Sequence, residues 1–327
     1  MRWLVRSLIG LAVLATLAIS VALALVASPP PPVDATRDVF GFARLDTGPP
    51  ADLPPFETFA ARDGEELGFR RYDSAAQRVL VFVHGSSYHG VSYHALASQL
   101  SRSGAAKVAL PNLRGHHLSG RRRGDVEYVG QLEDDVFDLI AHLRREGWGG
   151  PLTLGGHSSG GGFAIRFAGG ASAGVASSLL LLAPVIPTSP ALRGDGDAGG
   201  WASVHLRRVF GLALLNAVGI HGFDALPVIQ FAKPRRFWDG SETLAYSHRL
   251  NASYHPRADY ASDLRAARTK PLLVLVGADD EAVDGAALRE LFAADAEAVE
   301  VLPGVDHFGV YREPAVLERI AGWLRTL

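Results

Sequence analysis

The clearest pattern in the chain is a series of short, continuous apolar runs separated by segments with helical spacing of apolar residues. Such runs, rich in Val, Leu and Ile, are typical of strands buried on both faces of a parallel sheet. We predict strands at residues 78–83, 107–110, 152–154, 175–183, 271–277 and 299–302. We predict helices at residues 125–146, 163–168 and 284–294, and a last helix that begins at Pro314. This alternation favours an α/β fold with a doubly wound, mostly parallel sheet.

The segment between residues 184 and 270 interrupts the alternation, because it contains no comparable buried run. Its apolar residues follow helical spacing over residues 206–218. We therefore interpret residues 184–270 as a helical cap insertion over the carboxyl ends of the strands, where ligands bind in open α/β sheets. The core domain is then divided into residues 56–183 and residues 271–327.

The N-terminus is the longest apolar run of the chain. Arg2 and Arg6 precede residues 8–27, which are interrupted by only three small residues. As a helix this run is about 30 Å long, enough to cross a bilayer. We predict that residues 1–28 are a signal anchor, with the arginines on the cytoplasmic side and the catalytic domain outside the cytoplasm. A cleaved signal peptide and a secreted protein are the alternative. Residues 29–55 are rich in proline and are predicted to be a linker.

Composition and charge exclude several classes of function. The net charge of −2 gives no general attraction to nucleic acid, so we expect no such partner. The chain has no cysteine, which excludes disulfides, thiolate zinc sites and a cysteine nucleophile. Its histidines form no His-Glu-x-x-His motif and no cluster with carboxylates at helical ligand spacing. We therefore expect no metal site and no cofactor.

The most informative motif is Gly156-His157-Ser158-Ser159-Gly160, between a predicted strand and a predicted helix. A serine at the tip of a sharp strand-to-helix turn is typical of a nucleophile elbow. Gly156 and Gly160 fit this turn, because the residues two before and two after the serine come very close together. A glycine-rich loop without catalytic function is the alternative. A P-loop is excluded because no lysine follows, and a dinucleotide fingerprint because His157 takes the place of its second glycine.

A serine nucleophile needs a general base, and the base needs an orienting carboxylate. The chain supplies both after the motif, in the order serine, acid, histidine that this architecture uses. Asp279 and Asp280 follow the predicted strand that ends at Gly277, and His307 follows the last predicted strand. All of them lie at carboxyl ends of strands, as Ser158 does. The residues alone leave both aspartates open as the acid.

Five motifs in this order resemble the α/β-hydrolase fold enzymes, nearest to the serine aminopeptidase and monoglyceride lipase or lysophospholipase branch. They are His84-Gly85-Ser86, Arg114-Gly115-His116, Gly156-His157-Ser158-Ser159-Gly160, Gly277-Ala278-Asp279-Asp280 and Asp306-His307-Phe308. The resemblance implies that Ser158 is the nucleophile, His307 the base and Asp280, rather than Asp279, the acid. It also implies an oxyanion hole formed by the backbone N–H groups of Ser86 and Ser159.

Together these observations predict a membrane-tethered, cofactor-free serine hydrolase that cleaves a carboxylic ester through an acyl-enzyme. An acyl lipid or another apolar acyl ester is favoured, because the predicted cap helix and the anchor are apolar. Carbon–carbon bond hydrolysis, perhydrolysis and peptide cleavage remain open on this fold, and so does a non-enzymatic exported binding or scaffold protein. Activity is expected to fall as His307 protonates, at about pH 6.5 or below for an unperturbed imidazole.

Overall fold

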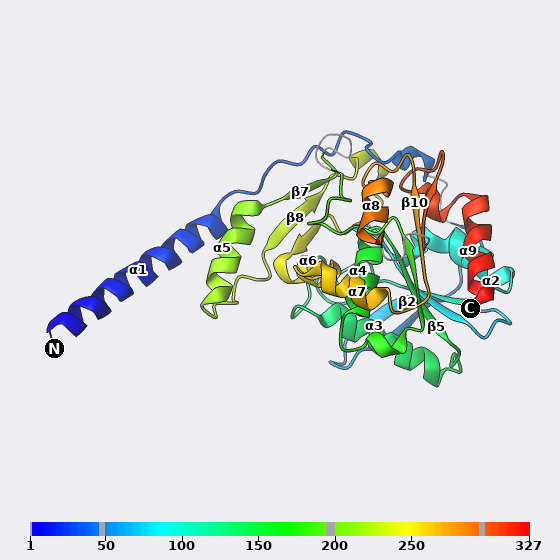
Figure 1. Cartoon of the computed structure of the whole chain (residues 1–327), viewed down its shortest axis with the longest axis horizontal. Helices are drawn as coiled ribbons and strands as arrows, with labels where there is room; N and C mark the ends of the chain where they lie inside the picture. Colours follow the sequence, from blue (N-terminus) through cyan, green and yellow to red (C-terminus); the bar gives the residue numbers. More distant parts are fainter. Residues whose placement is uncertain (1, 46–49, 194–199, 294–297) are drawn as a thin grey trace.

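The computed structural model describes residues 2–45, 50–193, 200–293 and 298–327. At the centre of this part of the chain is an eight-stranded sheet with the order β1-β2-β4-β3-β5-β6-β10-β11 (Figure 1). The strands are β1 (Phe56–Ala60), β2 (Glu66–Tyr72), β3 (Val79–Val83), β4 (Lys107–Pro111), β5 (Leu152–His157), β6 (Ser178–Leu182), β10 (Leu272–Gly277) and β11 (Val299–Leu302). β2 pairs antiparallel with β1 and β4, and the other neighbours are parallel. The predicted mostly parallel sheet is confirmed.

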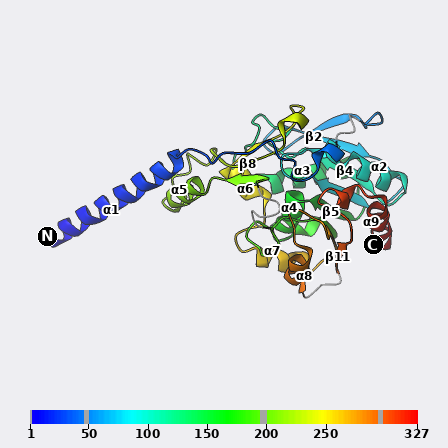
Figure 2. The same ribbon diagram turned by 90° about the horizontal axis from the view of Figure 1, so that it is seen from above.

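Helices lie on both sides of this sheet (Figures 1 and 2). On one side α2 (His94–Arg102) contacts α9 (Pro314–Thr326), and on the other lie α3 (Gln131–Arg145) and α4 (Ser159–Ala168). A further helix, α8 (Gly285–Leu291), leads from β10 towards β11. β3, β5 and β6 are buried at every residue, because both faces are covered.

Three predicted helices differ in their bounds. α4 begins at Ser159, four residues before the predicted range 163–168. α3 begins six residues later than the predicted range 125–146, at Gln131, because Gly130 has a φ of 104° and ends the preceding loop in a left-handed conformation. The predicted helix at residues 284–294 corresponds to α8, and residue 294 lies outside the described residues. The loops after β3, β5, β10 and β11 meet at one edge of the sheet, as the sequence predicts for parallel strands.

The cap is not purely helical. Between β6 and β10 the chain forms α5 (Leu206–Ala217), α6 (His248–Tyr254) and α7 (Tyr260–Ala267), together with a three-stranded antiparallel sheet. Its strands are β7 (Ala202–Val204), β8 (Pro227–Phe231) and β9 (Ala245–Ser247). β7 and β9 span three residues each, so they show no apolar run that predicts a strand. The prediction of a helical cap is correct for its helices and wrong in omitting this sheet. Residues 194–199 of the predicted cap lie outside the described residues.

The N-terminal helix α1 (Arg2–Ala27) extends away from the body of the molecule (Figure 1). Within it, Arg6–Ala27 is long and apolar enough to cross a membrane, and it lies mostly outside the protein core. The last turns of α1 pack against α5. The chain then runs across the cap towards the carboxyl ends of the strands (Figures 1 and 2).

The predicted linker at residues 29–55 is more than a spacer. Its residues Phe40 and Phe42 are buried in the main core, although the surrounding sequence is rich in proline. Asp38 accepts a hydrogen bond from the backbone N–H of Phe42, which fixes the short 3₁₀ helix Phe42–Arg44. Residues 46–49 of the linker lie outside the described residues. This segment reaches the candidate active site.

Candidate active site

Ser158 lies at the turn between β5 and α4, as the elbow motif predicts. Its backbone has a φ of 55° and a ψ of −123°, a combination that serine rarely adopts. The turn is held by hydrogen bonds from the Ser158 N–H to Leu182 and from the N–H groups of Gly162 and Val185 to the Ser158 carbonyl. The side chain of Ser158 is partly exposed, at the carboxyl edge of the sheet.

The two glycines of the motif are required by close backbone contacts. A Cβ atom on Gly156 would lie 2.2 Å from the carbonyl oxygen of Gly160. A Cβ atom on Gly160 would lie 2.3 Å from the carbonyl oxygen of Val83 at the end of β3. Both distances are far below van der Waals contact and involve backbone atoms that cannot move aside. The spacing of glycines in the sequence therefore reflects the packing of the turn against β3.

His307 and Asp280 form a buried pair. The Nδ1 atom of His307 lies 3.0 and 2.9 Å from the two carboxylate oxygens of Asp280, and both side chains are almost completely buried. Asp280 Oδ1 also accepts hydrogen bonds from the N–H groups of Ala282 and Val283, at 2.8 and 2.7 Å. Asp279 is exposed. Of the two aspartates left open by the sequence, Asp280 is the one that contacts His307.

The hydrogen bonds of the described residues do not include one between Ser158 and His307. Such bonds are often long when no substrate is bound and become short only in the reacting complex. The two residues are nevertheless held in adjacent loops by His157, whose ring lies 4.5 Å from the ring of His307.

A chain of hydrogen bonds through His157 connects three loops of the site. The N–H of Gly85 donates to the hydroxyl of Tyr93, and this hydroxyl contacts Nδ1 of His157, both at 2.9 Å. Nε2 of His157 lies 2.9 Å from the carbonyl oxygen of His307. Because a carbonyl only accepts, Nε2 carries the proton, and Tyr93 donates to Nδ1. Burial, followed by the charge on His307, lowers the pKa of His157 well below its usual value, which keeps the ring neutral in this role.

Ser86 and Ser159, the residues expected to supply the oxyanion hole, lie side by side. Their hydroxyl oxygens are 2.5 Å apart, and Nε2 of His255 lies 3.2 Å from Ser159 Oγ. Gly85 packs so closely that a Cβ atom there would lie 3.2 Å from Cβ of Ser158. The loop after β3 therefore packs closely against the elbow, and the space beside Gly85 is too small for a larger side chain.

Tyr246 and Tyr254 of the cap contact this loop, and neither contact is predicted by the sequence. The hydroxyl of Tyr246, on β9, accepts a hydrogen bond from the N–H of Ser87 at 2.7 Å and lies 2.8 Å from Nε2 of His116. His84 connects this loop to the segment after β4, because its Nε2 accepts a hydrogen bond from the N–H of Leu113. His84 is fully buried, as expected for a structural histidine.

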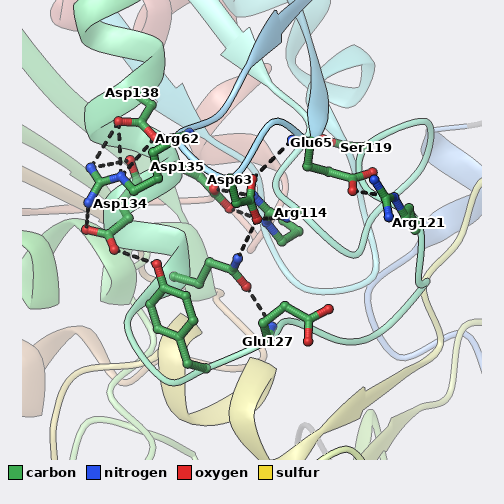
Figure 3. Close-up of polar contacts among 12 residues, drawn as sticks. Arg62, Asp63, Glu65, Arg114, Ser119, Arg121, Glu127, Asp134, Asp135 and Asp138 are labelled. Carbon is green, nitrogen blue, oxygen red and sulfur yellow. Dashed lines mark hydrogen bonds and ion pairs between the residues drawn. The ribbon is translucent and has the colours of Figure 1, made fainter.

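Arg114, next to this loop, is held by a buried ion-pair network (Figure 3). Its guanidinium donates two hydrogen bonds to Asp135 on α3, both 2.8 Å long. A third goes to Asp63, 3.1 Å away, in the turn between β1 and β2. The network fixes the segment that carries His116, and so supports the contact with Tyr246.

The predicted linker supplies an aromatic wall at the site. The ring of Phe40 stacks on His307, with ring centres 4.9 Å apart and planes at 25°. Phe40 also contacts Trp201 and Phe308, and Phe42 contacts Tyr88 and Phe237. No signal in the sequence identifies Phe40 as a neighbour of His307, because the contact joins segments at opposite ends of the chain.

The pKa of His307 is shifted upward. Burial acts to lower it, but the charge of Asp280, the hydrogen bond to Asp280 and the charges of Glu281 and Asp306 raise it by more. Glu281 Oε2 also accepts a hydrogen bond from the N–H of His307, at 3.1 Å. Half-protonation is therefore expected above the pH of about 6.5 that applies to a free imidazole.

Replacing Glu281 with glutamine is expected to move the acid limb of the kcat/KM profile to lower pH. Glutamine keeps the hydrogen bond to the His307 N–H but removes a charge that raises the pKa of His307. As pH falls through this pKa, His307 gains a proton and can no longer act as a base. The midpoint of the acid limb should lie above pH 6.5 in the wild type and at a lower pH in Glu281→Gln than in the wild type. Glu290→Gln, at an exposed position on α8, is the control and should have the wild-type midpoint. An equal midpoint in all three proteins would contradict this prediction.

No group of three or more His, Asp and Glu side chains is arranged to hold a metal ion within the part of the chain that the structure describes. The polar groups around Ser158 are instead hydrogen-bonded to one another, as described above. The arrangement is suited to proton transfer and acyl transfer by side chains.

Comparison with known proteins identifies the fold. Residues 74–222 match the family described as serine aminopeptidase, S33. Among solved structures, a monoacylglycerol lipase of Paleococcus ferrophilus is 21% identical with a TM-score of 0.56, over 79% of this chain and 99% of that one. The chain has the α/β-hydrolase fold. The predicted resemblance to the serine aminopeptidase and monoglyceride lipase branch is confirmed by these matches.

Two further structures resemble this α/β-hydrolase over most of its length. A soluble variant of the monoglyceride lipase from Saccharomyces cerevisiae is 17% identical with a TM-score of 0.60, over 86% of this chain and 98% of that one. A bacterial membrane phospholipase A, described as a virulence factor, is 17% identical with a TM-score of 0.53, over 99% of this chain and 98% of that one. At these identities the likeness establishes the fold.

Proposed function

We propose that this α/β-hydrolase cleaves carboxylic esters with Ser158 as nucleophile, His307 as general base and Asp280 as the orienting acid. One observation supports this proposal most directly: the strained turn at Ser158 lies at the same edge of the sheet as the buried His307–Asp280 pair. Ser158 Oγ attacks the ester carbonyl carbon while its proton moves to Nε2 of His307. His307 then gives this proton to the leaving alkoxide, which departs as the alcohol. The acyl group remains bound to Ser158 as an acyl-enzyme. Water attacks the acyl-enzyme with His307 again as base, releasing the acid and free Ser158.

The backbone N–H groups of Ser86 and Ser159 are proposed to stabilise the oxyanion of each tetrahedral intermediate. The contact between their side chains and the close approach of Gly85 to Ser158 support this role. Such donors act strongly because they are already oriented before the reaction, and loss of one costs about 3–4 kcal/mol in other enzymes.

An apolar acyl ester, such as an acyl lipid, is the proposed substrate class. Aromatic side chains of the predicted linker, the cap and the loop of His307 lie beside His307. A hydrocarbon chain bound against these rings would gain free energy by leaving water. The monoacylglycerol and monoglyceride lipases among the structural neighbours support the same class.

We also propose that α1 is retained as a membrane anchor rather than cleaved as a signal peptide. Its residues Ala22 and Val26 are buried against Leu212 and Leu215 of α5. Arg208 of α5 donates a hydrogen bond to the carbonyl of Val26. Cleavage after α1 would remove this helix and expose Leu212 and Leu215 of α5 to water. With Arg2 and Arg6 on the cytoplasmic side, the catalytic domain lies outside the cytoplasm.

A fluorophosphonate probe tests the nucleophile. The probe forms a phosphorus–oxygen bond with an activated serine and releases fluoride, so the wild type should label and Ser158→Ala should not. Ser159→Ala, which leaves the backbone N–H in place, is the matched control and should still label. Failure of the wild type to label, or equal labelling of Ser158→Ala, would contradict the proposal.

A panel of acyl esters of increasing chain length, one aminoacyl amide and one diketone tests the reaction class. Esters should be cleaved faster than the amide and the diketone, and longer acyl chains should lower KM. Faster cleavage of the amide or of the diketone would instead identify a peptidase or a carbon–carbon bond hydrolase.

A further inference from the structure

One face of α5 is an exposed apolar stripe. Leu206, Phe210, Leu214 and Val218 follow one another at intervals of four residues, so they lie on the same side of the helix. Their exposed fractions are 61%, 64%, 49% and 62%. Large apolar side chains so exposed and so aligned are unusual on a surface that faces only water.

The opposite face of α5 packs against α1. Leu212 and Leu215 are fully buried, in a small cluster that contains Ala22 and Val26 of α1. Gly211 lies so close to α1 that a Cβ atom there would be 2.7 Å from the carbonyl oxygen of Ala22. The stripe is exposed because α1 packs against the opposite face of α5 and does not cover the stripe.

The contacts along α5 show how it runs relative to α1. His205, just before α5, contacts the carbonyl of Ser28, and Arg208 donates to the carbonyl of Val26. One turn further along α5, Gly211 reaches Ala22. α5 thus runs back along α1, from the end of the apolar segment Arg6–Ala27 into it. At 1.5 Å per residue, Ala22 lies roughly 7 Å inside the end of that segment.

We propose that α5 enters the outer layer of the same membrane that α1 spans, with its exposed apolar stripe against the lipid acyl chains. This inference rests on the proposed membrane anchor. If Ala22 and Val26 lie in the bilayer, the side chains of α5 that touch them must lie there too. Four apolar side chains in lipid rather than water favour this position.

The length and the end of α5 limit its depth. Its 12 residues span only about 18 Å, too short to cross the hydrocarbon core. The loop that follows contains Asp224, whose carboxylate lies 3.4 Å from Nδ1 of His221 and accepts a hydrogen bond from Asn216. Charged groups are tolerated near the headgroups but are costly at the centre of the bilayer. α5 is therefore placed at the interface, as a cap helix embedded beside the anchor.

The absence of cysteine from the chain allows a direct test with single-cysteine variants of the full-length protein. Phe210→Cys and Leu214→Cys report on the stripe, Leu14→Cys on α1, and Glu290→Cys on an exposed part of α8. Each variant is labelled with an environment-sensitive fluorophore and reconstituted into phosphatidylcholine vesicles. Emission is then measured with and without phosphatidylcholine that carries a spin label in its acyl chains.

The expected result is strong quenching by the spin-labelled lipid at positions 14, 210 and 214 and little at position 290. Quenching at 14 without quenching at 210 and 214 would overturn this inference while leaving the anchor in place. Absence of quenching at position 14 would instead contradict the anchor itself, and the inference with it. Blue-shifted emission at 210 and 214 without quenching would mean that protein, such as a second copy of the chain, covers the stripe, and would also overturn it.

Discussion

Replacing Asp280 with asparagine is expected to lower kcat by roughly 10⁴-fold, as the same change does to the orienting acid of other serine hydrolases. Of the two ring nitrogens of His307, the Asp280 carboxylate contacts Nδ1, which fixes the proton on that atom and leaves Nε2 free to accept one. An asparagine amide can donate to Nδ1 and so favours the wrong tautomer. It also removes the charge that stabilises His307 when it becomes protonated. The measurement is kcat on a soluble short-chain ester.

Asp279→Asn is the matched control, because Asp279 is the exposed neighbour of Asp280 in the same loop. Its kcat is expected to stay within about threefold of the wild type, since surface changes usually have small effects. An equal loss in both variants would indicate damage to the loop rather than loss of the acid. A small loss in Asp280→Asn would point to Glu281, whose carboxylate already contacts the backbone of His307.

The position of the site could be predicted from the sequence because its parts follow strands. Ser86, Ser158, Asp280 and His307 each come within a few residues of the carboxyl end of a strand. Parallel strands of one sheet bring these ends to the same edge, so the order of apolar runs and motifs is enough to place them together. The pattern needs no knowledge of how side chains pack.

Side chains that reach the site from elsewhere could not be predicted in this way. Phe40 stacks on His307 and Tyr246 contacts the loop of Ser87, yet neither lies in a motif. β9, which carries Tyr246, spans three residues, and Tyr246 pairs with Ile229 of β8, 17 residues earlier in the chain. Such contacts depend on tertiary packing, which local periodicity does not encode.

The face of α5 that is buried shows the same limit. Apolar residues at helical spacing, such as Phe210 and Leu214, are typical of the buried face of a helix. In the structure these residues are exposed, and Leu212 and Leu215 are buried instead. The reason is α1, which covers the second face from a distant part of the sequence. A helix that is apolar on two faces has two neighbours, and we propose that the second one is lipid.

The anchor and the active site are physically connected. After α1, the chain contacts the cap through the carbonyl of Ala35, which accepts from the N–H of Arg235, and then places Phe40 on His307. The cap in turn contacts the loop of Ser87 through Tyr246. Both connections join the candidate active site to segments that are continuous with α1 and α5. If α5 lies in the membrane interface, the site stands close to the lipid surface, which suits a substrate drawn from the bilayer.

Replacing Asp135 with alanine is expected to destabilise the protein by about 3–5 kcal/mol, because it leaves Arg114 buried without its main partner. The side chains of Arg114 and Asp135 are both almost completely buried, and two hydrogen bonds join them. Asp63 contacts the same guanidinium but is partly exposed and replaces only part of the lost interaction. The free energy of unfolding is measured on the full chain in detergent, from tryptophan emission in urea.

Asp134→Ala is the matched control, one residue away on α3 (Figure 3). Asp134 pairs with Arg62 at the surface, where both side chains are substantially exposed. Exposed ion pairs contribute about 1 kcal/mol or less, so this variant should unfold close to the wild type. A similar loss in both variants would mean that α3 itself, rather than the buried pair, has been weakened. If Asp135→Ala is the only one of the two variants that is destabilised, its activity on soluble esters is then measured at urea concentrations at which it is still folded. A loss of activity there means that the ion pair acts on the site by holding the segment of His116 against Tyr246.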